Sequence, residues 1–367
     1  MSVTKVTTPV IDSPGLESGQ RNFFLDGDFT SWVRGNVTGV GHSAYTSSLM
    51  MAKKGATDNL VWDAKQTSDA PTVAESGYAS TYCYHADITT AESALANDEY
   101  STARYHVTAN DFAHLHQKEM TLSFWHKHTK TGTCCVSFGN SAGDRYYVAT
   151  YTQSVSDTWE KATITLTGDT SGTWLYAGTG VGMTVDFVLI SGSDYHATAN
   201  TWTAGFKVGV TGMADHTDSA SNNFKIAQVG LYKGSSAPSS FVSESIATVK
   251  DQLAYYVEEL VLGDTSNEGW GVAGQVRTTT QANFAIGWKE KRVVPTLTVS
   301  DNDTFDGIHT ANDREAGAAT ATATADVGRR GCRLLWTAAT TGLTVGNDII
   351  LGRDGTDSTQ FLVDARH

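Results

Sequence analysis

The sequence predicts an all-β protein built around an antiparallel β-sandwich. Glycine is abundant, with 35 residues, proline is scarce, with 5, and Thr, Ser, Val and Tyr recur throughout. This composition favours strands and tight turns over helices. Many short strands with glycine-rich turns and no helices between them are typical of a sandwich.

The strand pattern is clearest between residues 22 and 234. In the stretch KATITLT, Ala162, Ile164 and Leu166 fall on one face of a strand, and threonines fall on the other. Turn sequences such as NSAGD and GDTSG separate the apolar runs. Strands are expected over residues 120–128, 134–140, 145–153, 159–168, 183–191 and 223–234.

The period of the apolar residues changes after the linker sequence GSSAPSS, residues 234–240. In SESIATVKDQLAYYVEEL they are spaced by 3, 4, 3 and 4 positions, at Ile246, Val249, Leu253, Tyr256 and Leu260. This spacing predicts a helix of about four to five turns, with Ser243 as N-cap and Gly263 beyond its end. The same spacing fits a coiled-coil seam. The predicted helix can therefore either pack on its own domain or contact another subunit.

Four parts are therefore expected along the chain. They are an extended N-terminal attachment arm over 1–21, a β-sandwich over 22–234, a linker and amphipathic helix over 235–263, and a smaller C-terminal β-rich domain over 264–367. Alternating runs such as NFAIGW and CRLLWTAA predict the C-terminal strands. In AATATATAD the small residues permit close approach of another sheet or subunit, and a plain core strand is the alternative.

Charge and cysteine usage narrow the classes of partner. The net charge of −13 argues against binding of nucleic acid and of anionic membrane surfaces. No signal peptide and no membrane-spanning run is expected. The four cysteines, Cys83, Cys134, Cys135 and Cys332, form no CxxC pair, so buried free thiols assembled in a reducing cytoplasm are expected.

Several widely spaced stretches carry a family resemblance. NFFLDGDFTSWVRG, LSFWHKHTKTGTCCVSFGN, ANTWTAGF and KIAQVGLYKG follow one another within residues 22–260. Together they resemble bacteriophage tail-fibre and virion structural proteins, which carry a domain similar to the jelly-roll carbohydrate-binding modules of glycoside hydrolases. The resemblance implies an all-β jelly-roll sandwich, followed here by one linking helix and a smaller C-terminal β-domain.

The resemblance implies that the protein is a structural component of a virion. It would be a fibre, tail-tip or head-decorating subunit that is assembled in the host cytoplasm. A homotrimer is expected, joined to other virion proteins through the N-terminal arm and contacting a host-surface glycan. One alternative is a non-catalytic carbohydrate-binding module or lectin. Another is a tailspike depolymerase, although these usually show a repetitive β-helix and this chain has no fixed period.

The resemblance also implies a metal position at Asp28, with Asp26 beside it. Related modules open their first strand with such a stretch, and the acidic residue often helps to hold a structural calcium. They usually add an aspartate from the last strand, where this chain has Ala227 and Gln228 in IAQV. No cofactor is therefore expected beyond a hypothetical calcium. The same two carboxylates are the candidate pair for glycoside hydrolysis, but no further motif supports a cleft, and no enzyme activity is predicted.

Five of the eleven histidines lie within 23 residues: His106, His114, His116, His126 and His128. In both HLH and HKH the two imidazoles are expected on one face of a strand. Such a pair suits a metal site, and a solvated polar patch is the alternative.

Aromatic residues in turn-like segments are the candidate glycan contacts. Trp174 and Tyr176 lie in GTWLYAGTG, and Tyr195 and Trp202 lie in YHATANTWTAG. Sugar rings stack on aromatic faces through their C–H edges, as other apolar groups do. Packing into the core is the alternative for each of these rings.

Overall fold

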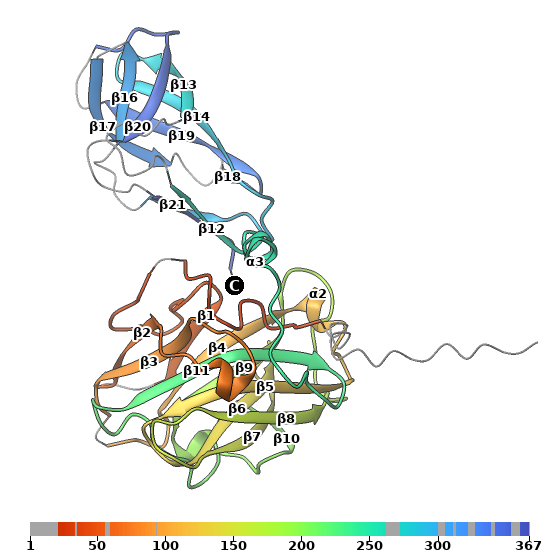
Figure 1. Ribbon diagram of the computed structural model, residues 1–367. Coiled ribbons are helices and arrows are strands. Elements are labelled where there is room, and N and C mark those ends of the chain that lie inside the picture. Colours follow the sequence, from red (N-terminus) through yellow and green to blue (C-terminus); the bar gives the residue numbers. More distant parts are fainter. Residues whose placement is uncertain are drawn as a thin grey trace, which may run out of the picture. The chain divides into compact units, whose positions relative to one another are not determined.

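In a computed structural model the chain divides into two compact units (Figure 1). The first unit comprises the described parts of residues 1–30, 38–44 and 52–244, and the second those of 31–37, 45–51 and 245–367. The structure describes residues 21–33, 35–55, 59–92, 94–261, 272–299, 305–310, 313–321, 327–338, 342–353 and 360–366. The predicted arm over 1–21 lies outside these residues except for Arg21.

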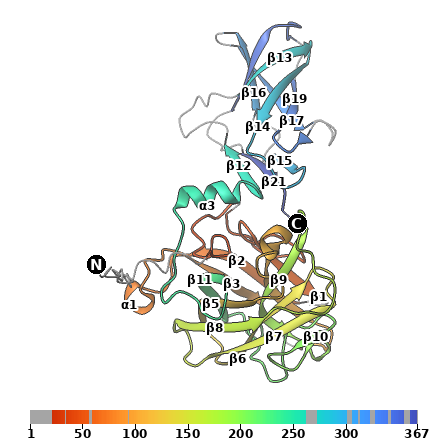
Figure 2. The same ribbon diagram turned by 90° about the vertical axis from the view of Figure 1, so that its right-hand side faces the viewer.

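The first unit is a sandwich of two antiparallel sheets (Figures 1 and 2). The six-stranded sheet has the order β1 (Met50–Gly55), β4 (Tyr100–Thr108), β9 (Val181–Ser191), β6 (Gly132–Asn140), β7 (Arg145–Gln153) and β10 (Trp202–Ala204). The five-stranded sheet has the order β2 (Val61–Thr67), β3 (Cys83–Thr90), β11 (Asn223–Lys233), β5 (Glu119–His128) and β8 (Glu160–Thr167).

The strand order is that of a jelly roll. From β3 to β9 the chain passes from one sheet to the other at every step except the β6–β7 hairpin, and β11 returns between β3 and β5. This places β4-β9-β6-β7 opposite β3-β11-β5-β8, the arrangement of eight strands in two sheets that defines the fold. The predicted jelly-roll sandwich is thus confirmed.

The alternation of apolar residues explains why these strands form. The side chains of Ala162, Ile164 and Leu166 in β8 are buried while the threonines between them are exposed, as predicted. The aromatic rings of the inward faces meet between the sheets. Phe124 of β5 lies edge-on to Phe187 of β9 at 5.2 Å and to Tyr151 of β7 at 5.1 Å between ring centroids. Burial of such rings is the main source of the stability of the sandwich.

The stretch NFFLDGDF is not a strand, which corrects the expectation that it opens the first strand. Residues 23–28 form turns, with Asp26 at φ 55° and Phe29 at φ 52°. The segment nevertheless runs beside β11, because the Phe23 amide donates to the Leu231 carbonyl at 2.8 Å. The segment lies beside the β-bulge that β11 forms between Ala227 and Gly230. A regular strand could not keep its register with β11 across this bulge.

Gly27 is required at the closest point of this contact. The Val229 amide donates to the Gly27 carbonyl at 2.8 Å, and a Cβ added to Gly27 would lie 1.9 Å from the Val229 oxygen. We expect Gly27→Ala to lower the free energy of unfolding by about 1 to 3 kcal/mol, as overpacking does elsewhere. Urea unfolding measures this change.

Gly41→Ala is the matched control, because a Cβ at exposed Gly41 would meet nothing within 4 Å. It should change stability by less than about 0.5 kcal/mol. Equal effects of the two substitutions would contradict the importance of the close approach.

Helices are few and short in the first unit. Single-turn helices α1 (Val73–Ser76) and α2 (Ala109–Phe112) and the 3₁₀ turn η2 (Ser193–Tyr195) connect strands. In α1, Thr72 and Glu75 form a capping box, which satisfies the free amides of its first turn.

The linking helix α3 (Ile246–Leu253) is shorter than the apolar spacing predicts. Its N-cap is Ser245, whose hydroxyl accepts from the Thr248 amide, and not Ser243. After Leu253 the chain turns into strand β12 (Val257–Val261), which pairs with β21 (Gln360–Asp364). A partner strand about a hundred residues away overrides the local helical period, as tertiary pairing commonly does.

The second unit is β-rich. One of its sheets has the order β12-β21-β15 (Thr296–Val299). The other has the order β14 (Gln281–Gly287), β13 (Val272–Thr278), β20 (Asp348–Arg353), β16 (Phe305–Thr310), β17 (Asp313–Ala321), β19 (Gly331–Ala338) and β18 (Val327–Gly328). Because β14 also pairs with β19, this sheet closes on itself around a core that includes Phe284, Leu334 and Trp336.

Residues from both ends of the described chain meet in the second unit. The Arg366 guanidinium donates to the carbonyls of Ser47 and Ser48 at 3.0 and 3.1 Å and lies 3.7 Å from the Tyr45 ring centroid. Asp364 holds the same guanidinium through its carboxylate. The segment 45–51 therefore belongs to this unit, although its last two residues begin strand β1 of the sandwich.

The cysteines are buried and free, as predicted. Burial raises the pKa of the Cys134 and Cys135 thiols to about 12. No helix in the described ranges is long and apolar enough to cross a membrane.

Candidate functional site

Three of the four predicted aromatic residues belong to one continuous array of rings. Tyr176 stacks on His116 at 4.7 Å, His116 meets Phe112 at 5.7 Å, and Phe112 stacks on Trp174 at 5.2 Å. Trp174 then lies edge-on to Trp202 at 5.4 Å, and Trp202 meets Tyr147 at 5.3 Å. These six residues are called the aromatic array below.

Three parts of the fold bring the aromatic array together. Phe112 ends α2 and His116 lies in the turn that follows it, while Trp174 and Tyr176 lie in the loop after β8. That loop is tied to α2 because the Gly178 amide donates to Asn110 Oδ1 at 3.0 Å. Trp202 opens β10 and is in register with Tyr147 of β7.

Hydrogen bonds fix the two indoles. Trp174 Nε1 donates to the Ser171 carbonyl at 2.9 Å, and Trp202 Nε1 donates to the Thr167 carbonyl at 2.8 Å. Both indoles are thus held by the end of β8 and the loop after it, which limits the rotamers of the rings that pack on them. A ring held in this way loses little conformational freedom when a ligand stacks on it.

Exposure separates the roles of these rings. Trp174 is only 7% exposed, so it supports the array and offers no free face, whereas Tyr176 is 55% exposed. Trp202 and Tyr147 are half-buried at the other end of the array. The surface that a ligand can reach is therefore the Tyr176 ring and the partly open rings of Trp202 and Tyr147.

Tyr195, the fourth predicted residue, lies in a different cluster. Its ring is edge-on to Tyr100 at 4.7 Å and to Phe206 at 5.4 Å. This cluster covers the outer face of the six-stranded sheet, where Tyr146, Val148 and Val188 also pack against it. Tyr195 is therefore part of a covering layer on the sheet.

An ion pair lies next to that covering layer. Arg104 Nε donates to Asp186 Oδ1 at 2.7 Å and Arg104 Nη2 to Oδ2 at 3.0 Å. Thr102 adds a hydrogen bond of 2.8 Å to Oδ1, and the Asp186 side chain is 0% exposed. The Arg104 guanidinium lies 5.8 Å from the Phe206 ring centroid. This pair was not predicted, because an isolated Arg and an isolated Asp on two different strands carry no sequence motif.

The two predicted metal ligands are both buried in the turn before β1. Asp28 Oδ2 accepts from the Tyr78 hydroxyl at 3.1 Å, and Asp26 and Asp28 are 8% and 7% exposed. Where the structure describes side chains, no group of three or more His, Cys, Asp or Glu is placed to hold a metal ion. In β11 the neighbouring position is Gln228, whose Nε2 donates to Ser76 Oγ at 2.9 Å. The described residues do not complete the calcium position that the resemblance implies.

The two predicted histidine pairs, HLH and HKH, do not form a metal site on the surface of the described sandwich. His114 and His116 lie in a turn and not on a strand, which corrects that expectation for HLH. His126 and His128 do share one face of β5, but it is the inward face, and they are 1% and 0% exposed. His128 packs against the buried His216 at 4.8 Å between ring centroids. Burial lowers the pKa of His128 well below its usual value and that of His216 to about 3.

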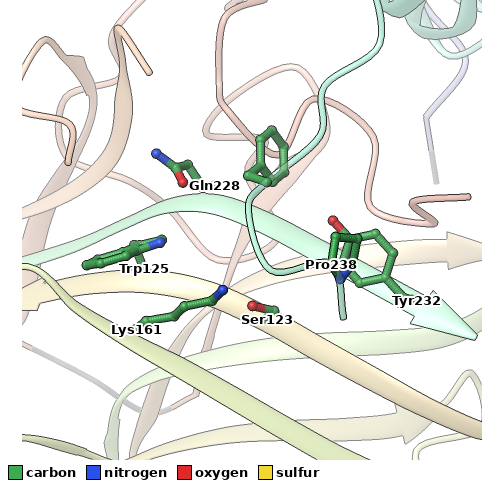
Figure 3. A pocket seen from close by; sticks show the side chains of 7 residues that line it. Ser123, Trp125, Lys161, Gln228, Tyr232 and Pro238 are labelled. Carbon is green, nitrogen blue, oxygen red and sulfur yellow. The ribbon is translucent and has the colours of Figure 1, made fainter. Parts of the chain in front are cut away.

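A second surface feature lies on the outer face of the five-stranded sheet. Trp125 of β5, which is half-buried on this face, was not among the predicted site residues. The alternation in LSFWHKH could have found it, because Phe124, His126 and His128 face inward and leave a tryptophan on the outward face. A small pocket beside Trp125 is lined by residues of three strands and of the segment after β11 (Figure 3).

Comparisons with known proteins find likenesses of fold. No protein-family model and no curated protein matches the chain. A structure solved as a candidate sugar-binding protein from Bacteroides thetaiotaomicron is 11% identical, with 58% of this chain and 100% of that chain covered and a TM-score of 0.33. A family 61 carbohydrate-binding module, solved with β-1,4-galactotriose, is 10% identical over 58% of this chain and 99% of that chain, with a TM-score of 0.29.

The enzymatically active domain of tailspike protein 4 of bacteriophage CBA120 is also similar. It is 11% identical, with 54% of this chain and 22% of that chain covered and a TM-score of 0.28. Likenesses at these scores carry no argument about what the chain binds. The jelly-roll assignment rests on the strand order.

Proposed function

We propose that the chain is a non-catalytic glycan-binding protein that contacts saccharide through the aromatic array. The observation that carries the proposal is the Tyr176 ring, which is 55% exposed and stacked at 4.7 Å on His116. A flat ring held from behind offers a rigid apolar face, and pyranose rings present C–H edges to such faces. Trp202 and Tyr147, half-buried at the other end of the aromatic array, offer a second contact for a longer oligosaccharide.

The positions of the two predicted carboxylates support a non-catalytic role. Glycoside hydrolysis needs two carboxyl groups about 5 to 10 Å apart that flank the scissile bond. Asp26 and Asp28 are less than a tenth exposed, and Asp28 is bonded to the Tyr78 hydroxyl. Neither is placed to reach a sugar that lies on the surface.

Tyr176→Ala is expected to weaken glycan binding by roughly tenfold to hundredfold, because loss of a stacking ring costs about 1 to 3 kcal/mol. The measurement is titration of the full chain with oligosaccharides selected on an array of bacterial surface glycans. The melting temperature should change little, since this ring is exposed.

Two further variants separate binding from folding. Trp174→Ala should lower stability by about 3 to 5 kcal/mol, as loss of a buried indole does. Tyr82→Ala removes a half-buried ring outside the aromatic array and should leave affinity unchanged. Wild-type affinity in Tyr176→Ala, or no binding of the full chain to any glycan, would overturn the proposal.

We also propose that this protein is a bacteriophage virion subunit, a homotrimer joined to other virion proteins through residues 1–21. The sequence resemblance over residues 22–260 supports this role. Purified particles should contain the protein in stoichiometric copies, and deletion of residues 1–21 should prevent its incorporation. Absence from particles would overturn the virion role, and cleavage of a sugar polymer by the purified protein would favour a depolymerase instead.

A further inference from the structure

Four histidines of the described sandwich are buried, and His216 differs from the others in its position. His85 lies on β3, and His126 and His128 lie on β5, in strands that have a neighbouring strand on each side. His216 lies in the connection between β10 and β11, within residues 211–222, which are called the His216 loop below. A loop can open without breaking a sheet, whereas an inner strand cannot.

The His216 side chain is 0% exposed and lies among aromatic rings. Its ring centroid is 4.8 Å from that of His128 and 5.0 Å from that of Phe224, and both contacts are edge-on. Neither ring nitrogen of His216 has a hydrogen-bond partner among the described residues, and Nδ1 of His128 also lacks one. A buried neutral imidazole with unmatched nitrogens is already unfavourable, and a charged one is much more so.

The charged groups around His216 do not balance a proton on its ring. Burial is the main reason that the pKa of His216 falls to about 3, and the charge of Lys130 lowers this pKa further. Asp218 of the loop acts in the opposite direction, but its carboxylate is paired with Lys130 at 2.6 Å. On β5, charged forms of His126 and His128 would repel a charged His216. A proton on His216 is therefore unfavourable as long as the loop stays closed.

The other titratable neighbours do not supply a counter-charge either. The Tyr151 hydroxyl of β7 is bonded to His128 Nε2 at 2.9 Å. The Glu92 amide donates to a carbonyl of the loop at 2.9 Å, but the Glu92 carboxylate makes no hydrogen bond to His216. Burial raises the pKa of Asp215 in the loop. A carboxyl group of this kind favours the closed loop as the pH falls, so Asp215 cannot be the cause of opening in acid.

Few bonds hold the His216 loop on the sandwich. The amides of Ala214 and His216 donate to carbonyls of β6 and β9 at 2.7 and 3.2 Å, and the Glu92 amide donates to the Thr217 carbonyl. The ion pair between Asp218 and Lys130 is exposed. The fully enclosed side chains of the loop are those of His216 and Thr217. Segments held in this way open locally at a lower free energy than the strands around them.

We propose that the His216 loop is a pH-sensitive switch, which is closed at neutral pH and opens locally below about pH 6 while both sheets stay paired. In the open loop His216 is hydrated, and its pKa returns to about 6.5. Protonation then favours the open form about thirtyfold at pH 5. Opening also uncovers the side of His128 that His216 covers, so a second proton makes the transition steeper.

Hydrogen exchange of the full chain, followed by mass spectrometry at pH 7.5, 6 and 5, tests the switch. After correction for the intrinsic pH dependence of exchange, protection of the Glu92, Ala214 and His216 amides should fall about thirtyfold or more between pH 7.5 and 5. Low concentrations of urea should not change their exchange, because a local opening exposes little surface. Amides of β5 and β9 should stay protected over the same time.

Variants of the loop separate the imidazole from the carboxylates. His216→Leu has a similar volume and no titratable group, so the loop should be equally protected at pH 7.5 and 5. His216→Gln, which is also uncharged, should give the same result if leucine disturbs the packing. Asp218→Asn is the matched control, because it removes the ion pair with Lys130 and leaves the imidazole. It should lower protection equally at both pH values and keep the thirtyfold change.

Three results would overturn the switch. The first is unchanged protection of the wild-type loop between pH 7.5 and 5. The second is a pH dependence that persists in both His216 variants, or that disappears in Asp218→Asn, since either result assigns it to another group. The third is exchange of the loop amides only together with those of β5 and β9 and with the same dependence on urea, because the opening is then global unfolding.

Discussion

Asp186→Ala is expected to lower the free energy of unfolding by about 3 to 5 kcal/mol, the range for breaking a buried ion pair from one side. The Asp186 side chain is 0% exposed and that of Arg104 9%. Without the carboxylate, the guanidinium keeps a hydrogen bond to the Tyr146 hydroxyl at 3.3 Å but loses its counter-charge. Urea unfolding of the full chain measures the loss.

Two companion variants identify the cause. Arg104→Met combined with Asp186→Leu removes both charges and should recover most of the lost stability, because apolar pairs of similar volume replace buried ion pairs well. Lys130→Ala breaks the exposed pair with Asp218, whose side chains are 37% and 40% exposed, and should cost less than about 1 kcal/mol. A double variant no more stable than Asp186→Ala would contradict the electrostatic explanation.

The protein is expected to lose stability steeply between pH 7.5 and pH 5. Burial lowers the pKa of His216 to about 3 and that of His85 to about 4, and also lowers the pKa of His126 and His128. An imidazole in the unfolded chain has a pKa of about 6.5. Below that pH the unfolded chain therefore binds protons that the buried imidazoles of the folded chain do not bind. The free energy of unfolding is therefore highest above pH 6.5. It falls as the pH decreases toward about 4 and about 3, the pKa values of His85 and His216 in the folded protein.

The size of the loss follows from the same linkage. At about 1.36 kcal/mol per pH unit, His216 and His85 should each cost about 2 kcal/mol at pH 5. His126 and His128 act in the same direction. Carboxylates titrate mainly below this range, so urea unfolding at pH 7.5, 6 and 5 reports chiefly on the imidazoles.

His216→Leu tests the assignment within the core. Both ring nitrogens of His216 lack a partner among the described residues, so an apolar side chain of similar volume should be tolerated at pH 7.5. It should reduce the loss between pH 7.5 and 5 by about 2 kcal/mol. His114→Leu, at an exposed turn position, is the control. Identical pH profiles for wild type and His216→Leu would contradict the prediction.

The sandwich was predictable because some of its strands alternate clearly, although others, such as β9, are buried over nearly their whole length. In β8 and β5 the apolar side chains follow one another at every second position, and that period is a property of the local sequence. The end of α3 was not predictable in the same way. Its apolar spacing continues through Tyr256 and Leu260, but β12 is specified by its pairing with β21, about a hundred residues further on.

The site was predictable only as a set of residue types. Turn-like sequence around Trp174 and Tyr176 pointed to a surface, yet one ring is 7% and the other 55% exposed. That difference depends on Phe112 and His116 of a distant segment, which no local pattern reveals. The pocket depends on Gln228 in the β11 bulge, where the Val229 amide donates to the Gly27 carbonyl of a distant segment, and no pattern within β11 reveals that neighbour.

The two guanidinium hydrogen bonds from Arg366 to Ser47 and Ser48 have a consequence for biosynthesis. The chain passes between the two units after residues 30, 37, 44, 51 and 244. A ribosome adds about 5 to 20 residues per second. Segment 45–51 is therefore synthesised tens of seconds before the last strand of its unit. During that interval the Ser47 and Ser48 carbonyls lack the Arg366 guanidinium, while strands β2 to β11 already have their neighbouring strands. The sandwich is thus able to fold before the second unit is complete, whereas the second unit must wait for synthesis of β21 and is the part for which a chaperone would matter.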